Sequence, residues 1–485
     1  MKFEEETPKP HFVLVPFMAQ GHTIPMIDMA HLLAKQGAMV TFITTPANAT
    51  RIESTIDRAR ELNLPIYFVP LRLDCAKVGL PEGCENVDKV LGKEQVKSLT
   101  DAYSLLHKPL VSYLQAQSNP PSSIISDLCQ PWTGDVAREL GIPRFMFNGF
   151  CAFSSLCRYI IHQERVFEKV ADDNGLIILP GFPHHLEISK AKSPGNFNSP
   201  GFEQFSEKIL EEERRSDGVV TNSFYELEPV YHEAYQKKIG KKVWSLGPMF
   251  LCNTDMSAIA VRGDKASVDP KRCLQWLESM KPGSVLYVSF GSMARTVISQ
   301  LKEIALGLEA SRRPFLWVIK SDDEASDIEK FLAEGFEERT RDRGLIIRGW
   351  AQQAMILSHP SLGGFVTHCG WNSTIEGISN GVPMITWPHC AEQFLNEKLI
   401  VDILKVGVPV GVKSITSRTM EAHEVSVVKR DYIEKAVLKL MGEDTDAKER
   451  RMRARELKQK ARQARDGGSS YSNIQQLIEY ATTRK

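Results

Sequence analysis

Short apolar runs alternate with amphipathic segments along most of the chain. Residues 11–17 (HFVLVPF) and 39–45 (MVTFITT) are predicted to be buried strands, and residues 23–36 between them an amphipathic helix. An alternation of strand and helix is typical of parallel sheets covered by helices on both faces. Further strands are predicted in this half at 65–71, 122–128, 143–148 and 217–222, with 217–222 as the last.

The pattern breaks once and then restarts. Residues 251–270 show no periodicity and are predicted to be a linker, and the tail, 446–483, is charged and helical. After the linker, strands are predicted at 284–290, 314–319, 344–350, 362–367, 382–387 and 406–410, with helical segments such as 299–311 and 391–402. The sequence therefore predicts two α/β domains, each a doubly wound parallel sheet, that face each other.

Composition narrows the kind of partner. Sixty Lys and Arg balance sixty Asp and Glu, so there is no basic field to hold nucleic acid or an anionic membrane. Nine Cys without a CxxC pair argue against a disulfide framework or a zinc site and favour a reducing compartment. The start of the chain has no apolar signal region, and no stretch reaches 18 uninterrupted apolar residues. We expect a cytoplasmic protein, without membrane insertion, that binds a small molecule.

Four loops lie where such a ligand is expected. In open α/β sheets, ligands bind beyond the carboxyl ends of the strands. The loops at these ends are 19–25 (AQGHTIP), 126–132 (SDLCQPW), 290–294 (FGSMA) and 367–373 (THCGWNS). None contains the GxGxxG dinucleotide fingerprint or a GxxxxGK[ST] phosphate loop.

The turn THCGWNS permits two interpretations. A helix that begins near Asn372 or Ser373 would present free backbone N–H groups and the positive end of its dipole to a phosphate, with His368 as a further donor. However, Ser373 and Glu376 also fit a capping box, in which the carboxylate only returns to a backbone N–H. From this turn alone the capping box is the commoner arrangement.

The wider sequence resembles a known family. Residues 350–393 (WAQQAMILSHPSLGGFVTHCGWNSTIEGISNGVPMITWPHCAEQ) resemble, in register, the signature box of plant UDP-dependent glycosyltransferases. The resemblance extends over the chain through PFMAQGHTIPMIDMA, WSLGP and VSFGSMA. It implies the GT-B fold, with an active site in the cleft between two Rossmann-like domains. The implied parts are an acceptor-binding domain over 1–250, a linker over 251–270, a UDP-sugar-binding domain over 271–466, and a final helix, about 467–485, that returns to the first domain.

The resemblance also assigns the donor site. It implies that Trp350 stacks on uracil, that Glu376 accepts from the ribose hydroxyls, and that several loop residues hold the diphosphate and the sugar. The implied UDP-sugar residues are Ser292, Trp350, Ala351, Gln353, His368, Trp371, Asn372, Ser373, Glu376, Glu392 and Gln393. Among them, His368, Asn372, Ser373 and Ser292 are assigned to the diphosphate, and Glu392 and Gln393 to the sugar hydroxyls.

The end of the box bears on the choice of sugar. Gln393 as the last residue, with Trp371 inside the box, resembles the pattern of glucose users, so the resemblance implies UDP-glucose. Position 392 is Glu where Asp is common, and His389 and Cys390 stand where larger apolar residues are frequent. These departures bear on donor and acceptor preference.

His22 and Asp127 are the predicted catalytic pair. A neutral imidazole is suited to removing a proton from an acceptor hydroxyl, and a carboxylate at the end of a strand can orient it. His22 matches the family's base, and the two groups should lie within about 3 Å. The alternatives are a packing or capping role for His22 and a helix N-cap for Asp127.

The reaction expected from this pair is inverting transfer of glucose to a hydroxyl, giving a β-O-glucoside. We expect no metal or other cofactor, because the helix at 372–373 with His368 and Ser292 can stabilise the departing diphosphate. The one DxD, Asp444 to Asp446, lies where a helix begins, and acidic residues favour that end of the helix dipole.

The acceptor is expected to be a small apolar molecule such as a flavonoid, another phenolic, a triterpenoid or a hormone. Its predicted lining is Phe17, Met18, Asn148, Phe150, His389 and Ala391. Two alternatives stay open: a nucleotide-sugar epimerase or hydrolase of the same fold, and an inactive small-molecule binding protein. A monomer is expected.

Overall fold

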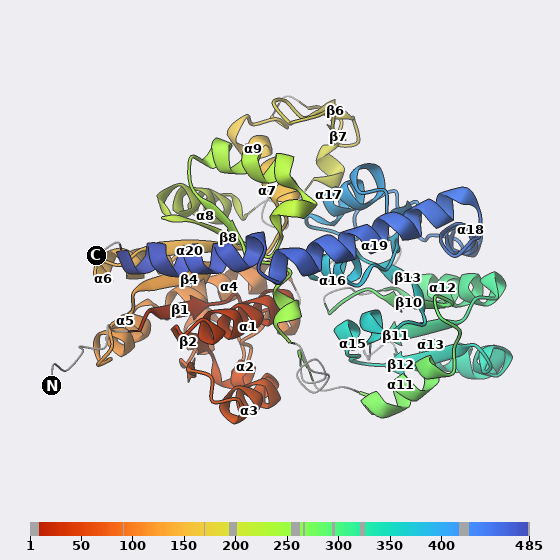
Figure 1. The fold of residues 1–485 in the computed structure, drawn as a ribbon, viewed down its shortest axis with the longest axis horizontal. Helices are drawn as coiled ribbons and strands as arrows, with labels where there is room; N and C mark the ends of the chain where they lie inside the picture. The colour runs from red at the N-terminus through yellow and green to blue at the C-terminus, as the bar shows by residue number, and fades with distance from the viewer. Residues whose placement is uncertain are drawn as a thin grey trace.

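The computed structural model describes residues 9–90, 92–168, 170–193, 201–253, 262–264, 267–292, 296–320, 325–416 and 426–483. These residues form two α/β domains side by side, each with a parallel sheet between helices, and the last two helices cross both domains (Figure 1). The predicted fold class, two Rossmann-like domains, is confirmed. Of the linker predicted over 251–270, residues 254–261 and 265–266 lie outside the described residues.

The first domain contains a seven-stranded parallel sheet in the order β3-β2-β1-β4-β5-β8-β9. Its strands are β1 (His11–Val15), β2 (Met39–Thr44), β3 (Ile66–Pro70), β4 (Ser123–Asp127), β5 (Arg144–Asn148), β8 (Gly218–Thr221) and β9 (Val243–Ser245). The prediction that 217–222 is the last strand was wrong. The three residues of β9 form the edge strand beyond it, and so short a run carries little periodicity.

The second domain contains a six-stranded parallel sheet in the order β12-β11-β10-β13-β14-β15. Its strands are β10 (Val285–Ser289), β11 (Phe315–Ile319), β12 (Gly344–Arg348), β13 (Leu362–Thr367), β14 (Met384–Thr386) and β15 (Gly407–Pro409). All six were predicted as apolar runs. Central strands such as β13 are buried along their whole length, which is why their sequences are continuously apolar rather than alternating.

Helices cover both sheets. Those of the first domain are α1 (Gln20–Lys35), α2 (Pro46–Arg51), α3 (Glu53–Glu61), α4 (Lys93–Ser104), α5 (His107–Gln115), α6 (Thr133–Leu140), α7 (Ala152–Gln163), α8 (Glu203–Arg215) and α9 (Pro229–Ile239). Those of the second are α11 (Pro270–Glu278), α12 (Ile298–Ser311), α13 (Ala325–Phe331), α14 (Glu337–Thr340), α15 (Gln353–Ser358), α16 (Trp371–Asn380), α17 (Gln393–Lys398) and α18 (Arg430–Leu440). The tail forms α19 (Thr445–Arg465) and α20 (Ser469–Thr483), and a small antiparallel hairpin joins β6 (Ile177–Ile178) to β7 (Glu187–Ile188).

Helix α20 packs on the first domain. The Trp244 ring of β9 forms a cluster with Phe145 of β5 and Tyr480 of α20, whose ring centroids lie 5.3 and 5.2 Å from its own. Asn473 donates from Nδ2 to the Ser245 carbonyl at 3.1 Å, and the side chains of α20 that face the sheet are buried. The end of the chain is thereby attached to the edge strand of the first sheet.

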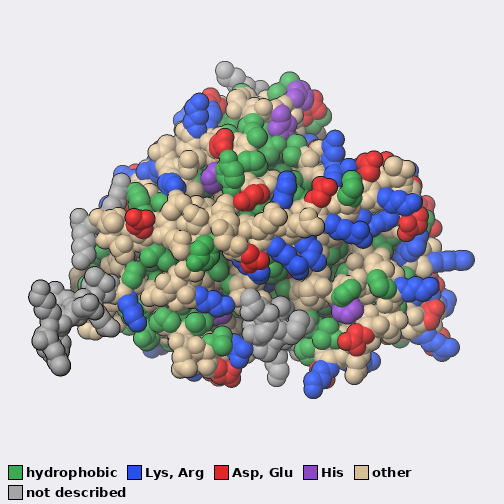
Figure 2. All heavy atoms as spheres, viewed as in Figure 1, with side chains coloured by type: hydrophobic (Ala, Val, Ile, Leu, Met, Phe, Trp, Pro, Cys, Tyr) green, Lys and Arg blue, Asp and Glu red, His purple; other side chains and the backbone are tan. Residues whose placement is uncertain are grey.

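The surface carries charges of both signs. On the face drawn in Figure 2, acidic and basic side chains are interspersed, as expected from the equal totals of the two. In the described part of the chain, no helix combines the length and the apolarity needed to cross a bilayer.

Candidate active site

The predicted catalytic pair is formed. His22 lies in the first turn of α1, and Asp127 is the last residue of β4. Because β1 and β4 are parallel neighbours, the turn after β1 and the end of β4 meet at one edge of the sheet. Nδ1 of His22 lies 2.8 Å from Oδ2 of Asp127. The predicted start of this helix, residue 23, was too late, because Gly21 and Pro25 are weak helix formers that mask its first turn.

Asp127 is held by a second hydrogen bond. Its Oδ1 accepts the backbone N–H of Cys129 at 2.9 Å, and the carboxylate is fully buried. The next helix, α6, begins at Thr133, so Asp127 is not its N-cap. A carboxylate can only accept, so Nδ1 of His22 carries the shared proton and Nε2 of the neutral ring is left as the basic nitrogen.

Opposing effects set the pKa of His22. Burial lowers it, but the charge of Asp127, the hydrogen bond to Asp127 and the charge of Glu392 together raise the pKa above its ordinary value. Glu392 belongs to the second domain, so His22 and the predicted sugar site lie within electrostatic reach of each other. The edge of the Phe17 ring also meets the imidazole, with centroids 5.3 Å apart.

Among the described residues, one group has the geometry to hold a metal ion: His22, Asp127 and Cys129, whose ligand atoms lie within 4.8 Å of one another. Burial, together with the charge of Asp127, raises the pKa of the Cys129 thiol well above its ordinary value. Metals bind the thiolate, and Nδ1 of His22 already donates to the carboxylate. These side chains therefore fit a hydrogen-bonded catalytic pair better than a metal site.

The only DxD of the sequence begins a helix. Asp444 is the N-cap of α19, and its carboxylate accepts the N–H of Ala447 at 2.7 Å. This agrees with the predicted position of the acidic pair at the start of a helix.

The turn after β13 carries the predicted diphosphate loop. Helix α16 begins at Trp371, and its N-cap residue is Gly370. No side-chain hydrogen bond caps this end of the helix among the described residues. Cys369 just before it is fully buried in a left-handed conformation, with φ 64°. Such a conformation costs about 1–3 kcal/mol in a residue other than Gly and is concentrated at functional sites.

The capping box that competed with a ligand site is not formed. Ser373 and Glu376 lie inside α16, one to two residues deeper than the predicted start would place them. Gln353 instead joins the two: its Nε2 donates to Ser373 Oγ at 3.0 Å and to Glu376 Oε2 at 2.8 Å. Oε1 of Glu376 accepts from Nη1 of Arg262 at 2.5 Å. Three residues predicted at the donor site thus form one network.

Trp350 and Ala351 follow β12 at the same edge of the second sheet. Both are partly exposed, and the backbone N–H of Trp350 donates to Ser267 Oγ at 2.7 Å. The indole Nε1 is buried and has no hydrogen-bond partner among the described residues.

His368 packs against the FGSMA loop, of which residues 293 and 294 lie outside the described part of the chain. A Cβ on Gly291, whose φ is +76°, would lie 2.6 Å from the His368 ring, so this approach requires glycine. Ser292 is the next residue of the loop. Burial, and then the charge of His389, lower the pKa of His368 to about 3, and burial lowers that of His389 to about 4. Both imidazoles are therefore neutral hydrogen-bonding groups.

The turn predicted to hold the diphosphate, hereafter the donor turn, contacts the first domain directly. Nε1 of Trp371 donates to the Asn222 carbonyl at 2.8 Å, and Nδ2 of Asn372 donates to the Gly21 carbonyl at 2.5 Å. The Gly21 carbonyl is free to accept because its helical partner four residues on is Pro25, which has no N–H. The turn that carries His22 is therefore hydrogen-bonded to the turn predicted to hold the diphosphate.

The end of the box forms a tight turn. Oε1 of Gln393 accepts the N–H groups of His389 and Cys390 at 2.8 and 3.1 Å. Ala391, which follows Cys390, is left-handed with φ 53°. Glu392 is buried, which raises the pKa of its carboxyl. The two residues predicted at the sugar therefore stand on a turn that Gln393 itself shapes.

The residues predicted to line the acceptor site differ in their exposure. Phe17 and Met18 are buried, whereas Phe150 is partly exposed. Asn148 is fully buried; its Nδ2 donates to Ser155 Oγ at 2.9 Å and its Oδ1 accepts the N–H of Phe150 at 3.3 Å. The amide of Asn148 thus serves hydrogen bonds within the first domain. His389 and Ala391 lie in the turn described above.

Sequence reasoning missed three residues of the site. Asn222 follows the carboxyl end of β8, so the rule that selected the four loops would also have selected it. Asp28 is a carboxylate in an otherwise apolar buried stretch of α1, which was a usable signal. Arg262 lies in the stretch without periodicity, where no pattern marks it.

Comparison with known protein families supports the resemblance. A family model described as UDP-glucoronosyl and UDP-glucosyl transferase matches residues 230–447. UDP-glycosyltransferase 73C11 of Barbarea vulgaris is 45% identical over 473 residues, which cover 97% of this chain and 96% of that protein.

Solved structures of plant UGT proteins are similar to this chain over nearly its whole length. UGT73P12 of Glycyrrhiza uralensis, complexed with glycyrrhetinic acid 3-O-monoglucuronide, has a TM-score of 0.89 at 37% identity and covers 98% of this chain and 96% of its own. UGT2 of Phytolacca americana, complexed with UDP-2fluoro-glucose and pterostilbene, has a TM-score of 0.75 at 28% identity, with 98% and 100% covered.

Proposed function

The chain belongs to the plant UDP-glycosyltransferase family, and from this premise we propose that it transfers glucose from UDP-glucose, with inversion, to a hydroxyl of an apolar plant metabolite. One observation carries the proposal. The His22–Asp127 pair, joined at 2.8 Å, lies on a turn that is hydrogen-bonded to the donor turn through Gly21 and Asn372. An inactive binding protein would not need such a base, and an epimerase or a hydrolase would not need it beside an apolar acceptor site.

In the proposed reaction, Nε2 of His22 removes the proton of the acceptor hydroxyl while the oxygen attacks the anomeric carbon. The bond from that carbon to the diphosphate oxygen breaks, and UDP leaves with the bonding electrons through an oxocarbenium-like state. The proton stays on His22, and Asp127 stabilises the imidazolium. Attack from the face opposite UDP converts an α-linked donor into a β-O-glucoside.

The donor is held, in this proposal, by the network around α16. Trp350 stacks on uracil with Ala351 and Gln353 beside the base, and Glu376 accepts from the ribose. The N-terminus of α16, with His368, Asn372, Ser373 and Ser292, receives the diphosphate. Backbone N–H groups and neutral imidazoles stabilise the leaving group by hydrogen bonding, so the reaction requires no metal or other cofactor.

The sugar and the acceptor are proposed at the level of class. Gln393 and Trp371 support glucose, and UGT2 of Phytolacca americana was solved with UDP-2fluoro-glucose. Phe17, Met18 and Phe150 support an apolar acceptor. The complexes of relatives with glycyrrhetinic acid 3-O-monoglucuronide and with pterostilbene agree with a flavonoid, another phenolic, a triterpenoid or a hormone.

The test is incubation with UDP-glucose and a panel of phenols and terpenoid alcohols. We expect UDP release that depends on the acceptor, with one new β-glucoside identified by mass spectrometry and NMR. His22→Ala should abolish O-glucosylation while UDP still binds, whereas His107→Ala, a change in a surface ion pair with Glu139, should leave turnover intact. UDP release without acceptor, or full turnover by H22A, would refute the proposal.

A further inference from the structure

Residues Arg262 to Asp264, hereafter the linker strap, are attached to the first domain by two ion pairs. Nε and Nη2 of Arg262 lie 3.0 and 2.9 Å from Oδ2 of Asp28 in α1. Asp264 accepts from Nε and Nη2 of Arg51, at the end of α2, at 3.2 and 2.8 Å. The strap is thereby fixed at both of its ends to helices of the first domain.

The same strap reaches the second domain at Glu376. Nη1 of Arg262 lies 2.5 Å from Oε1 of Glu376, whose side chain is only 3% exposed. The other carboxylate oxygen already accepts from Gln353. Each oxygen of Glu376 therefore has a protein donor, and because the side chain is almost fully buried, a ribose hydroxyl can reach it only where one of these donors gives way.

The strap also covers part of the Trp350 indole. A Cβ on Gly263 would lie 2.4 Å from Cζ2 of Trp350, so the strap backbone is in contact with the ring edge. The φ of Gly263 is +92°, a conformation that other residues adopt only with strain. This glycine permits both the bend and the close approach.

From these contacts we propose that Arg262 is a determinant of donor affinity, because it competes with the donor ribose for Glu376 and must be displaced when UDP-sugar binds. The proposal rests on the proposed function, which assigns the ribose to Glu376 and uracil to Trp350. The strap is held by the first domain and covers a nucleoside site in the second. Donor binding therefore works against a contact between the domains.

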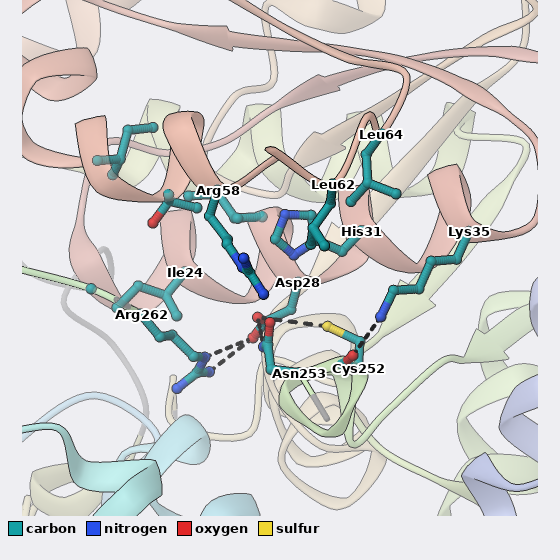
Figure 3. Close-up of a pocket in the computed structure, with 14 residues that line it drawn as sticks. Ile24, Asp28, His31, Lys35, Arg58, Leu62, Leu64, Cys252, Asn253 and Arg262 are labelled. Carbon is teal, nitrogen blue, oxygen red and sulfur yellow. Dashed lines mark hydrogen bonds and ion pairs between the residues drawn. The ribbon is translucent and has the colours of Figure 1, made fainter. Parts of the chain in front are cut away.

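A groove on the first-domain side can receive the displaced side chain. It is an open groove with a cavity volume of about 40 Å³ between α1, α3 and the strap, and both Asp28 and Arg262 line it (Figure 3). His31 lines it too; its Nε2 is buried and has no hydrogen-bond partner among the residues that the structure describes. Burial lowers the pKa of His31, so the ring is neutral and can accept a hydrogen bond. Arg262 can thus leave Glu376 and remain paired with Asp28, which avoids an uncompensated buried charge.

The test is the affinity for UDP, measured by isothermal titration calorimetry. Arg262→Gln should lower the Kd for UDP by about tenfold, or about 1.4 kcal/mol, because one oxygen of Glu376 becomes free. In an E376Q background the same change should alter the Kd less than about twofold, since there is no carboxylate left to compete for. Arg272→Gln, an exposed arginine of α11, is the matched control and should change nothing.

A second variant tests the proposal independently of Arg262→Gln, and thermal melting will show whether each variant is folded. Gly263→Ala adds a Cβ against Trp350 and should also lower the Kd for UDP. A Kd that is unchanged or higher in both R262Q and G263A, or a decrease that persists in the E376Q background, would overturn the strap proposal alone. If neither the wild-type protein nor R262Q binds UDP, the proposed donor site is wrong and the strap proposal falls with it.

Discussion

Replacing Asp127 by Asn tests the catalytic pair most directly, because the two residues have the same shape. The amide oxygen can keep the hydrogen bond from the Cys129 N–H, which leaves the amide NH₂ facing His22 Nδ1. Nδ1 must then accept, and the proton moves to Nε2, the nitrogen that should act as the base. The variant therefore loses both the charge that stabilises the imidazolium and the correct tautomer.

The magnitude follows from the geometry. At 2.8 Å, with an effective dielectric constant of about 20, Coulomb's law gives about 6 kcal/mol for the ion pair. Since 24% of the His22 side chain is exposed, solvent screening leaves about half of this, about 3 kcal/mol or a 10²-fold lower rate. The wrong tautomer adds to the loss, so we expect kcat to fall by between about 10² and 10⁴.

The assay is steady-state UDP release at saturating UDP-glucose and acceptor, with the Kd for UDP measured in parallel. That Kd should stay at the wild-type value. Asp135→Asn is the control, because this aspartate is half exposed and pairs with Arg138 at the surface. A D127N enzyme within about fivefold of the wild-type kcat would show that Asp127 does not support the base.

Three further predictions test the base, the final helix and the DxD. Since the pKa of His22 is raised and the neutral ring is the proposed base, kcat/KM should fall as the pH drops through a value above 6.5. Glu392→Gln removes a charge that raises the pKa of His22, so it should move this acidic limb of the pH profile to lower pH. Leu477→Ala, at a fully buried position of α20, should cost about 2–4 kcal/mol and lower the melting temperature by about 5–10 °C, whereas the exposed Gln475→Ala should not. Asp444→Ala removes an N-cap and should cost about 1 kcal/mol by denaturant unfolding, yet leave activity, with or without chelator, unchanged.

The sheets were predictable because their strands are buried on both faces. Long continuous apolar runs, such as 362–367, identify central parallel strands, and β13 matches this run residue for residue. The edge strand β9 was not found because three residues carry no measurable period. Helix starts were also missed where Gly21 and Pro25 hide the first turn of α1.

The catalytic pair could be proposed because strand ends concentrate ligands in open α/β sheets, and the structure brings His22 and Asp127 to 2.8 Å. The capping box at Ser373 could not be excluded from sequence, because the start of α16 at Trp371 depends on the left-handed Cys369 before it. Contacts between distant segments, such as that of Arg262 with Glu376, leave no local pattern at all.

The return of the last helix to the first domain limits how the two halves can move. The chain passes between the domains twice, through residues 251–270 and again through residues 466–468 between α19 and α20. Three extended residues span at most about 10 Å, so the facing ends of α19 and α20 stay close together. The longer passage is restrained as well, because Arg262 and Asp264 within it pair with Asp28 and Arg51 of the first domain. A movement of one half against the other therefore has to turn about the junction of α19 and α20 or break these ion pairs.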